Sequence, residues 1–229
     1  MENERLKIFP LGESAMTIEF ADAISLAANK RAISLARRLT ENPFDGLIEA
    51  VPAYSSTTIF YDFSIVKKNF SAFPTAFAAV RNFVEKALTE LPDAENENSR
   101  LIEIPVSFAA HDALDLSFIA ESKSLSEQQV IEIFTNRVYR VFMLGFLPGF
   151  AYMGEVDERI AAPRRANPRL QVPAGSVAVA GRQTGIYPFA SPGGWHIIGR
   201  TDVEIFTPHS ASPTLLQTGD TVKFYAQQQ

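Results

Sequence analysis

Residues 172–201, VPAGSVAVAGRQTGIYPFASPGGWHIIGRT, decide the fold of this chain. Short apolar runs alternate there with turns rich in glycine and proline, a pattern typical of strands rather than helices. Many short strands joined by tight turns favour a β-barrel or a sandwich. For the second half of the chain we expect strands at 101–106, 138–144, 176–180, 185–188, 196–200, 203–206 and 221–225, and helices at 115–120 and 127–134.

Glycine, proline and arginine are unevenly distributed along the chain. Residues 145–213 contain nine of the twelve glycines and eight of the fourteen prolines, and every basic residue in that window is an arginine. The whole chain has 229 residues, of which 46% are hydrophobic and 21% charged, so it can bury a sizeable core. Residues 145–213 therefore belong to a folded protein, and we expect their loops to have a structural or a functional role.

Charge and residue counts exclude several classes of function. The net charge of −5 comes without a basic block, which argues against a nucleic-acid groove or a membrane-surface patch. Neither an apolar run of about 18 residues nor a signal-peptide pattern occurs, so we expect a cytoplasmic protein. Because the chain has no cysteine and three widely spaced histidines, we expect neither thiolate chemistry nor a bound metal.

The first half of the chain alternates strand and helix patterns. Its expected elements are strands at 7–10, 15–20, 47–51 and 57–61 and amphipathic helices at 24–39 and 75–91. This order suggests an α+β sandwich with both helices on one face of the sheet. The polar segment 92–100, PDAENENSR, is the best linker candidate. We therefore expect an N-terminal α+β domain over 1–95 and a β-barrel domain over 96–229.

The glycine-rich loops allow two interpretations. A tight loop at 145–150 could bring its backbone against a ligand or partner, since glycine removes the side chain from the wall. The alternative is a barrel corner with Phe146 and Phe150 in the core, and the residues alone favour it. The candidate loop residues are Gly145, Pro148, Gly149, Gly193 and Gly194.

Three arginines, Arg164, Arg165 and Arg169, lie among two prolines in segment 163–169. Proline keeps such a segment extended, so we expect the guanidinium groups to fan out rather than share one face. Forked guanidinium groups suit a carboxylate, a phosphate or an acidic partner surface. The alternative, to which the nearby acids at 155–158 give weight, is a solvated loop with weak surface ion pairs.

The stretch 181–196 mixes hydrogen-bonding side chains with the sole tryptophan, as small-ligand pockets do. The alternative is a pair of hairpins in which the aromatic rings pack and the polar groups cap turns. No P-loop occurs, so this chain alone is not expected to hold a nucleotide. A triad of Ser191, His196 and Asp202 is rejected, because no nucleophile elbow supports it. The candidate residues of a pocket are Gln183, Thr184, Tyr187, Ser191 and His196.

Five motifs follow one another in the second half: GFLPGF at 145–150, PRR at 163–165, VPAGS at 172–176, QTGIYP at 183–188 and SPGGW…IGRT at 191–201. With these motifs the chain resembles the family of the 5-oxoprolinase B subunit, also called allophanate hydrolase subunit 1. That family includes an inhibitor of a sporulation sensor histidine kinase. The resemblance implies an α+β first domain and a cyclophilin-like β-barrel second domain. It also implies two partner subunits, with which the protein opens 5-oxo-L-proline to L-glutamate at the expense of ATP.

The chain departs from the family pattern in two places. Where relatives show CYGGEFGPDL, residues 107–116 are SFAAHDALDL, with Ala109, Ala110 and His111 replacing two glycines and a glutamate. The family's usual histidine before Tyr-Arg-Val falls on Phe134. A carboxylate and an imidazole are thus missing, which weakens the catalytic hypothesis and leaves room for a divergent paralogue.

The resemblance supports two hypotheses of different classes. In the first, the chain is an enzyme subunit and a partner subunit holds most of the ATP. In the second, it is a non-enzymatic inhibitor that binds a sensor histidine kinase through its barrel groove and arginine loop. For the first hypothesis we expect charge stabilisation by Arg164, Arg165 and Arg200, orientation of the ring amide by Gln183 and Tyr187, and acid or base chemistry by His196.

Overall fold

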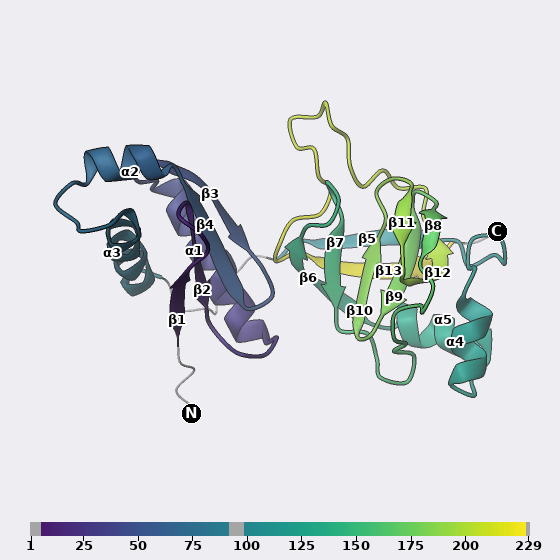
Figure 1. Cartoon of the computed structure of the whole chain (residues 1–229). Helices are drawn as coiled ribbons and strands as arrows, with labels where there is room; N and C mark the ends of the chain where they lie inside the picture. Colours follow the sequence, from purple (N-terminus) through teal and green to yellow (C-terminus); the bar gives the residue numbers. More distant parts are fainter. Residues whose placement is uncertain (1–5, 92–98, 228–229) are drawn as a thin grey trace. The chain divides into compact units, whose positions relative to one another are not determined.

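The computed structural model describes residues 6–91 and 99–227, which form two compact units divided between residues 98 and 99 (Figure 1). Each unit has a hydrophobic core of its own. The predicted boundary after residue 95 and most of the predicted linker at 92–100 lie outside the described residues.

The first unit is an antiparallel sheet with helices packed on it (Figure 1). Its strand order is β1-β2-β4-β3, with β1 at Lys7–Pro10, β2 at Ala15–Glu19, β4 at Ser56–Tyr61 and β3 at Leu47–Pro52. The helices are α1 (Leu26–Glu41), α2 (Phe63–Asn69) and α3 (Ala76–Thr89). Alternate residues of β2 and β4 form one core with α1 and α3, as the period of two in a strand requires.

Side-chain caps set the helix ends in this unit. The Ser25 hydroxyl accepts a hydrogen bond from the Ala28 amide, so α1 begins two residues after the predicted start, and Ile24 is left exposed. Thr75 caps α3 in the same way. Helix α2 was not predicted, because only Val66 of its seven residues is buried and no amphipathic period can show.

The second unit is a seven-stranded sheet that curls until its edges meet. Its strand order is β12-β9-β10-β7-β6-β13-β5. The edge strands are joined by an isolated bridge in which Ser107 and Arg200 exchange two backbone hydrogen bonds of 2.7 and 2.9 Å. The bounds are β5 (Leu101–Val106), β6 (Val138–Leu144), β7 (Ala151–Gly154), β9 (Ser176–Ala180), β10 (Gln183–Ile186), β12 (His196–Arg200) and β13 (Thr221–Ala226).

Two further layers complete the second unit. A separate two-stranded sheet pairs β8 (Arg169–Val172) with β11 (Ser191–Gly193). The helices are α4 (Leu116–Ser122) and α5 (Glu127–Thr135), and α5 begins with a capping box between Ser126 and Gln129.

The predicted barrel is confirmed in its coarse form, a mixed α/β unit with a nearly closed sheet, while the cyclophilin-like topology stays a prediction. The predicted strand at 203–206 is wrong: that segment forms a loop held by a single bridge between Phe206 and Thr214. Strands β7, β8 and β11 were not predicted.

Strand β9 is buried on both faces and separates two cores. Its valines, Val177 and Val179, point into the barrel core, while Ala178 and Ala180 belong to a second cluster on the other face. Alanine leaves space above a sheet, and aromatic rings occupy that space here. The candidate site lies in this second cluster.

Candidate functional site

A cavity of about 260 Å³ opens in the second unit beside the aromatic cluster. It fits the general description of a small-ligand site, an apolar hollow with a few polar groups. Of the predicted site residues, it contains Arg164, Tyr187, Gly193 and Gly194. The lining residues are Phe146, Phe150, Tyr152, Arg164, Pro168, Tyr187, Pro192, Gly193, Gly194 and Trp195.

The rings of the cavity wall pack edge to face around Phe150. Ring centroids lie 4.9 Å from Tyr152, 5.3 Å from Tyr187 and 5.5 Å from Trp195, with interplanar angles between 68° and 84°. Such pairs contribute about 0.5–1.5 kcal/mol each beyond their buried area. Phe150, Tyr187 and Trp195 are all buried. The wall is therefore preformed and rigid.

Glycine is required where the backbone meets these rings. A Cβ atom on Gly193 would overlap the Tyr187 hydroxyl oxygen and lie 2.8 Å from the ring atom Cζ. On Gly185 it would lie 2.8 Å from Cζ of Phe150. Both distances are shorter than van der Waals contact. Part of the glycine enrichment is thus explained by the aromatic cluster.

Two polar groups give the cavity its chemistry. Burial raises the pKa of the Tyr187 hydroxyl, while a hydrogen bond with the Trp195 backbone acts in the opposite direction, so the phenol keeps its proton. Arg164 is exposed at the cavity, and no carboxylate of residues 6–91 and 99–227 pairs with it. The arrangement suits a small ring that carries an anionic group.

The two aromatic residues Phe146 and Phe150 of the loop at 145–150 have different surroundings. Phe150 lies in the core, as the barrel-corner interpretation predicts. Phe146, in contrast, is 60% exposed, has a positive φ of 69°, and lies edge-on to Phe150 and Tyr187 at the cavity. A left-handed backbone at an exposed aromatic residue is strained and is often found at functional sites.

The arginine segment differs from the prediction. Arg165 and Arg169 do not fan out but converge on the buried carboxylate of Asp115, at 2.5 Å from the first and at 2.7 and 2.8 Å from the second. A buried carboxylate requires such partners, and this overrides the extended geometry set by the prolines. Only Arg164 reaches the cavity. The predicted substrate contact of Arg165 stays a prediction, while its observed partner is Asp115.

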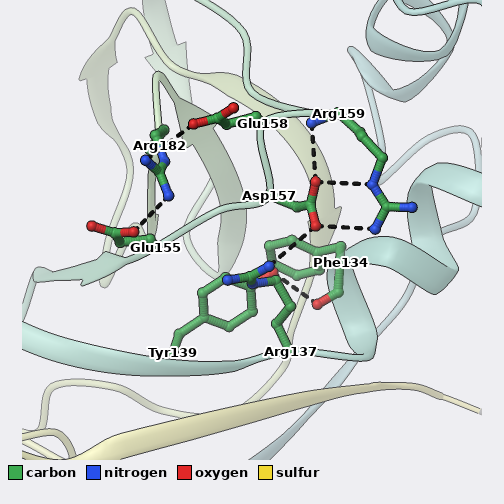
Figure 2. Close-up of polar contacts among 8 residues, drawn as sticks. All are labelled: Phe134, Arg137, Tyr139, Glu155, Asp157, Glu158, Arg159 and Arg182. Atoms are coloured by element: carbon green, nitrogen blue, oxygen red, sulfur yellow. Dashed lines mark hydrogen bonds and ion pairs between the residues drawn. The ribbon is translucent and has the colours of Figure 1, made fainter.

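The acids that precede this segment pair with other arginines (Figure 2). Arg182 lies 2.6 Å from Glu155 and 3.2 Å from Glu158. Asp157 accepts hydrogen bonds from Arg159 and Arg137, which hold its pKa well below the usual range. The solvated-loop alternative therefore describes segment 155–159, not the three arginines it was meant to explain. Figure 2 also shows that Tyr139 donates to the Phe134 carbonyl.

His196 is buried beside the cavity wall rather than in it. Its Nε2 donates to the Pro163 carbonyl at 2.9 Å, and its ring stacks on Phe118 at 4.9 Å. Burial lowers the pKa of the imidazole, so the ring is neutral near pH 7. The Ser191 hydroxyl contacts the Pro192 carbonyl, so no triad is assembled with His196. Acid or base chemistry at His196 stays a prediction.

The remaining predicted residues do not line the cavity. Thr184 donates to the Ala178 carbonyl inside the sheet, Gln183 begins β10, and Arg200 donates to the Ala174 carbonyl. Gly145, Pro148 and Gly149 belong to the same loop as Phe146 but do not line the cavity. Their roles in binding stay predictions. Sequence reasoning missed Tyr152, Pro168 and Asp115; only Tyr152 had a local signal, an aromatic residue close to GFLPGF.

A second cavity of about 320 Å³ lies where the barrel closes. Two of the departures from the family pattern, Ala109 and His111, line it, whereas Phe134 is fully buried in the barrel core against Tyr139 and Phe224. Thus neither departure alters the aromatic cavity. In the described part of the chain, no group of three or more His, Cys, Asp or Glu residues could hold a metal ion. The second cavity is lined by Ser107, Phe108, Ala109, His111, Asp112, Asp202 and Gln227.

The chain belongs to the family described as the carboxyltransferase domain, subdomain C and D, whose model matches residues 6–216. Among its relatives, the 5-oxoprolinase B subunit of Bacillus subtilis (strain 168) is 44% identical over 221 residues, 96% of this chain and 92% of that protein. The 5-oxoprolinase B subunit of Escherichia coli O157:H7 is 38% identical over 226 residues, 99% of this chain and 98% of that protein. The resemblance inferred from the motifs is thereby confirmed.

Solved structures share the fold. TTHA0988 matches with a TM-score of 0.80 and 36% identity over 94% of this chain, which spans only 40% of that longer chain. The Kluyveromyces lactis urea carboxylase matches with a TM-score of 0.74 and 20% identity over 97% of this chain and 22% of that chain, a likeness of fold alone. The described residues contain no helix long and apolar enough to cross a membrane. Inhibition of a sensor histidine kinase stays a prediction.

Proposed function

We propose that this chain is the B subunit of an ATP-dependent 5-oxoprolinase and that its aromatic cavity binds 5-oxo-L-proline. The observation that carries the proposal is a rigid aromatic hollow with Arg164 at its edge, an arginine that pairs with no carboxylate of the described residues. The relatives named as B subunits of 5-oxoprolinase, which match nearly the whole chain, support the choice of ligand. The substrate is a five-membered lactam with one carboxylate, the chemistry that such a cavity suits.

Each polar group has a defined task in this proposal. The lactam ring packs against Phe150 and Trp195, and Arg164 forms charge-assisted hydrogen bonds with the substrate carboxylate. The Tyr187 hydroxyl keeps its proton and donates to the lactam carbonyl oxygen, where negative charge develops as the ring opens. Opening adds water across the lactam C–N bond. The chain therefore orients and polarises the amide.

The size of this cavity argues against ATP as its ligand. A volume of about 260 Å³ lies below the roughly 300–1,000 Å³ usual for drug-sized ligands, and the sequence has no P-loop. We therefore place ATP mainly on a partner subunit, with two partners expected in the complex. The word "subunit" in the relatives' names supports a complex.

Reconstitution tests the proposal. Purified chain is mixed with the two partner subunits, and glutamate is measured with and without ATP and with each component omitted. We expect glutamate only from the complete mixture with ATP. Arg164→Gln should raise the KM for 5-oxoproline about 10- to 100-fold, as expected for the loss of charge-assisted hydrogen bonds. The control is Arg182→Gln, which removes an equal charge from a surface ion pair outside the cavity. Undiminished activity without this chain, or an unchanged KM in Arg164→Gln, would refute the proposal.

A further inference from the structure

The carboxylate of Asp115 is buried, and its partners differ from those that its sequence position suggests. It stands at the N-cap of α4, where an aspartate usually accepts a hydrogen bond from its own helix, yet it makes no such bond. Instead its Oδ2 accepts from the Ile197 amide at 2.7 Å, and its own amide donates to the Ile197 carbonyl at 2.8 Å. Asp115 is thus clamped to β12 by backbone and side chain together.

The other acceptor sites of Asp115 hold the arginine segment. Arg169 donates to both carboxylate oxygens and Arg165 to one of them. Burial of Asp115 raises the pKa of its carboxyl, but the hydrogen bonds from Arg169 and Ile197 and the charges of both arginines outweigh burial and lower that pKa. The carboxylate is therefore ionised, and both arginines are fixed to it.

Arg164 is held from both sides as a result. On one side, His196 donates to the carbonyl of Pro163, and Phe118 stacks on the imidazole ring. On the other, Arg165 bonds to Asp115 through its side chain and to the Gly194 carbonyl through its amide, at 2.8 Å. The backbone of Arg164 thus has little freedom, although its side chain is exposed.

We propose that Asp115 is a positioning residue for ligand binding: by holding Arg165 and Arg169, it sets Arg164 and Pro168 at the aromatic cavity. Asp115 does not line the cavity. Its effect passes through the segment between the two arginines. The inference rests on the proposed function only for the ligand used in the binding test.

Trp195 provides a readout that needs no activity. It is the sole tryptophan, it lines the cavity, and its indole N–H gives one resonance in a proton–nitrogen NMR spectrum of the full chain. The main variant is Arg165→Met, which leaves Asp115 paired with Arg169 and so keeps the buried charge neutralised. The matched control is Arg182→Met, the same change at a half-exposed arginine paired with Glu155. Thermal unfolding shows that each variant is folded.

We expect Arg165→Met to shift the Trp195 resonance and to weaken 5-oxoproline binding by about 10- to 100-fold, as expected when the charge-assisted hydrogen bonds of Arg164 are lost. Arg182→Met should change neither, and Arg165→Lys should restore part of the affinity. Asp115→Asn, if it folds, should act like Arg165→Met and more strongly. In the Arg164→Met background, Arg165→Met should cause a much smaller loss of affinity than it causes alone, because most of its effect passes through Arg164.

Two results would overturn the inference. One is a Trp195 resonance and an affinity in Arg165→Met that equal those of the wild type. The other is a loss in the double variant equal to the product of the two single losses, which would make Arg165 an independent ligand contact. A wild-type chain that fails to bind 5-oxoproline even with its partner subunits present would instead overturn the proposed function, and the resonance shift alone would then decide the role of Asp115.

Discussion

Replacing Gly193 with alanine should destabilise the second unit, whereas the same change at the neighbouring Gly194 should not. At Gly193 an added Cβ would overlap the Tyr187 hydroxyl oxygen and lie 2.8 Å from Cζ and 2.9 Å from Cε1. The Tyr187 ring is 1% exposed and packs edge to face against Phe150, so it cannot swing away without moving its neighbours. Inserting a methyl group into such a packed site costs about 1–3 kcal/mol.

Gly194→Ala is the matched control. Its added Cβ would meet Pro168 at 3.6 and 3.7 Å, which is ordinary contact, and its φ is not positive. At such a site alanine leaves stability unchanged or raises it by about 0.4–1 kcal/mol, by restricting the unfolded chain.

Urea unfolding followed by the fluorescence of Trp195 measures both variants. Because Trp195 is the sole tryptophan, the signal reports the second unit alone. We expect Gly193→Ala to lower the free energy of unfolding by about 1–3 kcal/mol relative to the wild type, and to weaken 5-oxoproline binding. Equal stability of the two alanine variants would refute the view that close packing of Tyr187 shapes the cavity.

Three more predictions concern the residues around this site. The pKa of His196 lies below its usual value of about 6.5, so the unfolded chain takes up a proton before the folded chain does as the pH falls below 6.5. The free energy of unfolding should therefore decline below pH 6.5, and His196→Gln should lack that decline. An NMR titration of the imidazole with a midpoint at or above 6.5 would contradict the reasoning. Tyr139→Phe leaves the Phe134 carbonyl without its buried donor and should lower the free energy of unfolding by about 1–3 kcal/mol. A thermal unfolding curve equal to that of the wild type would show that this hydrogen bond contributes nothing. Ser126→Ala removes the capping box of α5 and should lower the free energy of unfolding, measured with denaturant, by about 1 kcal/mol. The comparison is Ser122→Ala, at the C-terminal end of α4.

Local patterns predicted the elements whose side chains alternate or recur regularly. The strands at 7–10, 101–106, 138–144, 176–180 and 196–200 have the predicted bounds. Strands β8 and β11 could not be predicted, because each pairs only with the other and carries few buried side chains. Segment 203–206 has a strand-like composition, yet it meets a partner at a single bridge. Pairing in three dimensions, not local propensity, decides these segments.

The candidate site was predicted in part for a similar reason. Tyr187, Gly193 and Gly194 stood out as an aromatic residue and glycines in an unusual turn, and the structure brings them together. Asp115 could not be found, since no local feature separates a helix-capping aspartate from one that accepts two arginines about 50 residues further along the chain. The same contact explains why Arg165 and Arg169 turn inward while Arg164 stays at the cavity.

The most direct test is a crystal structure of the reconstituted complex soaked with 5-oxo-L-proline. We predict difference density in the cavity walled by Phe150, Tyr187 and Trp195, with the substrate carboxylate against Arg164. Density in the second cavity beside Ser107, or only on a partner subunit, would contradict the assignment of the aromatic cavity as the 5-oxoproline site.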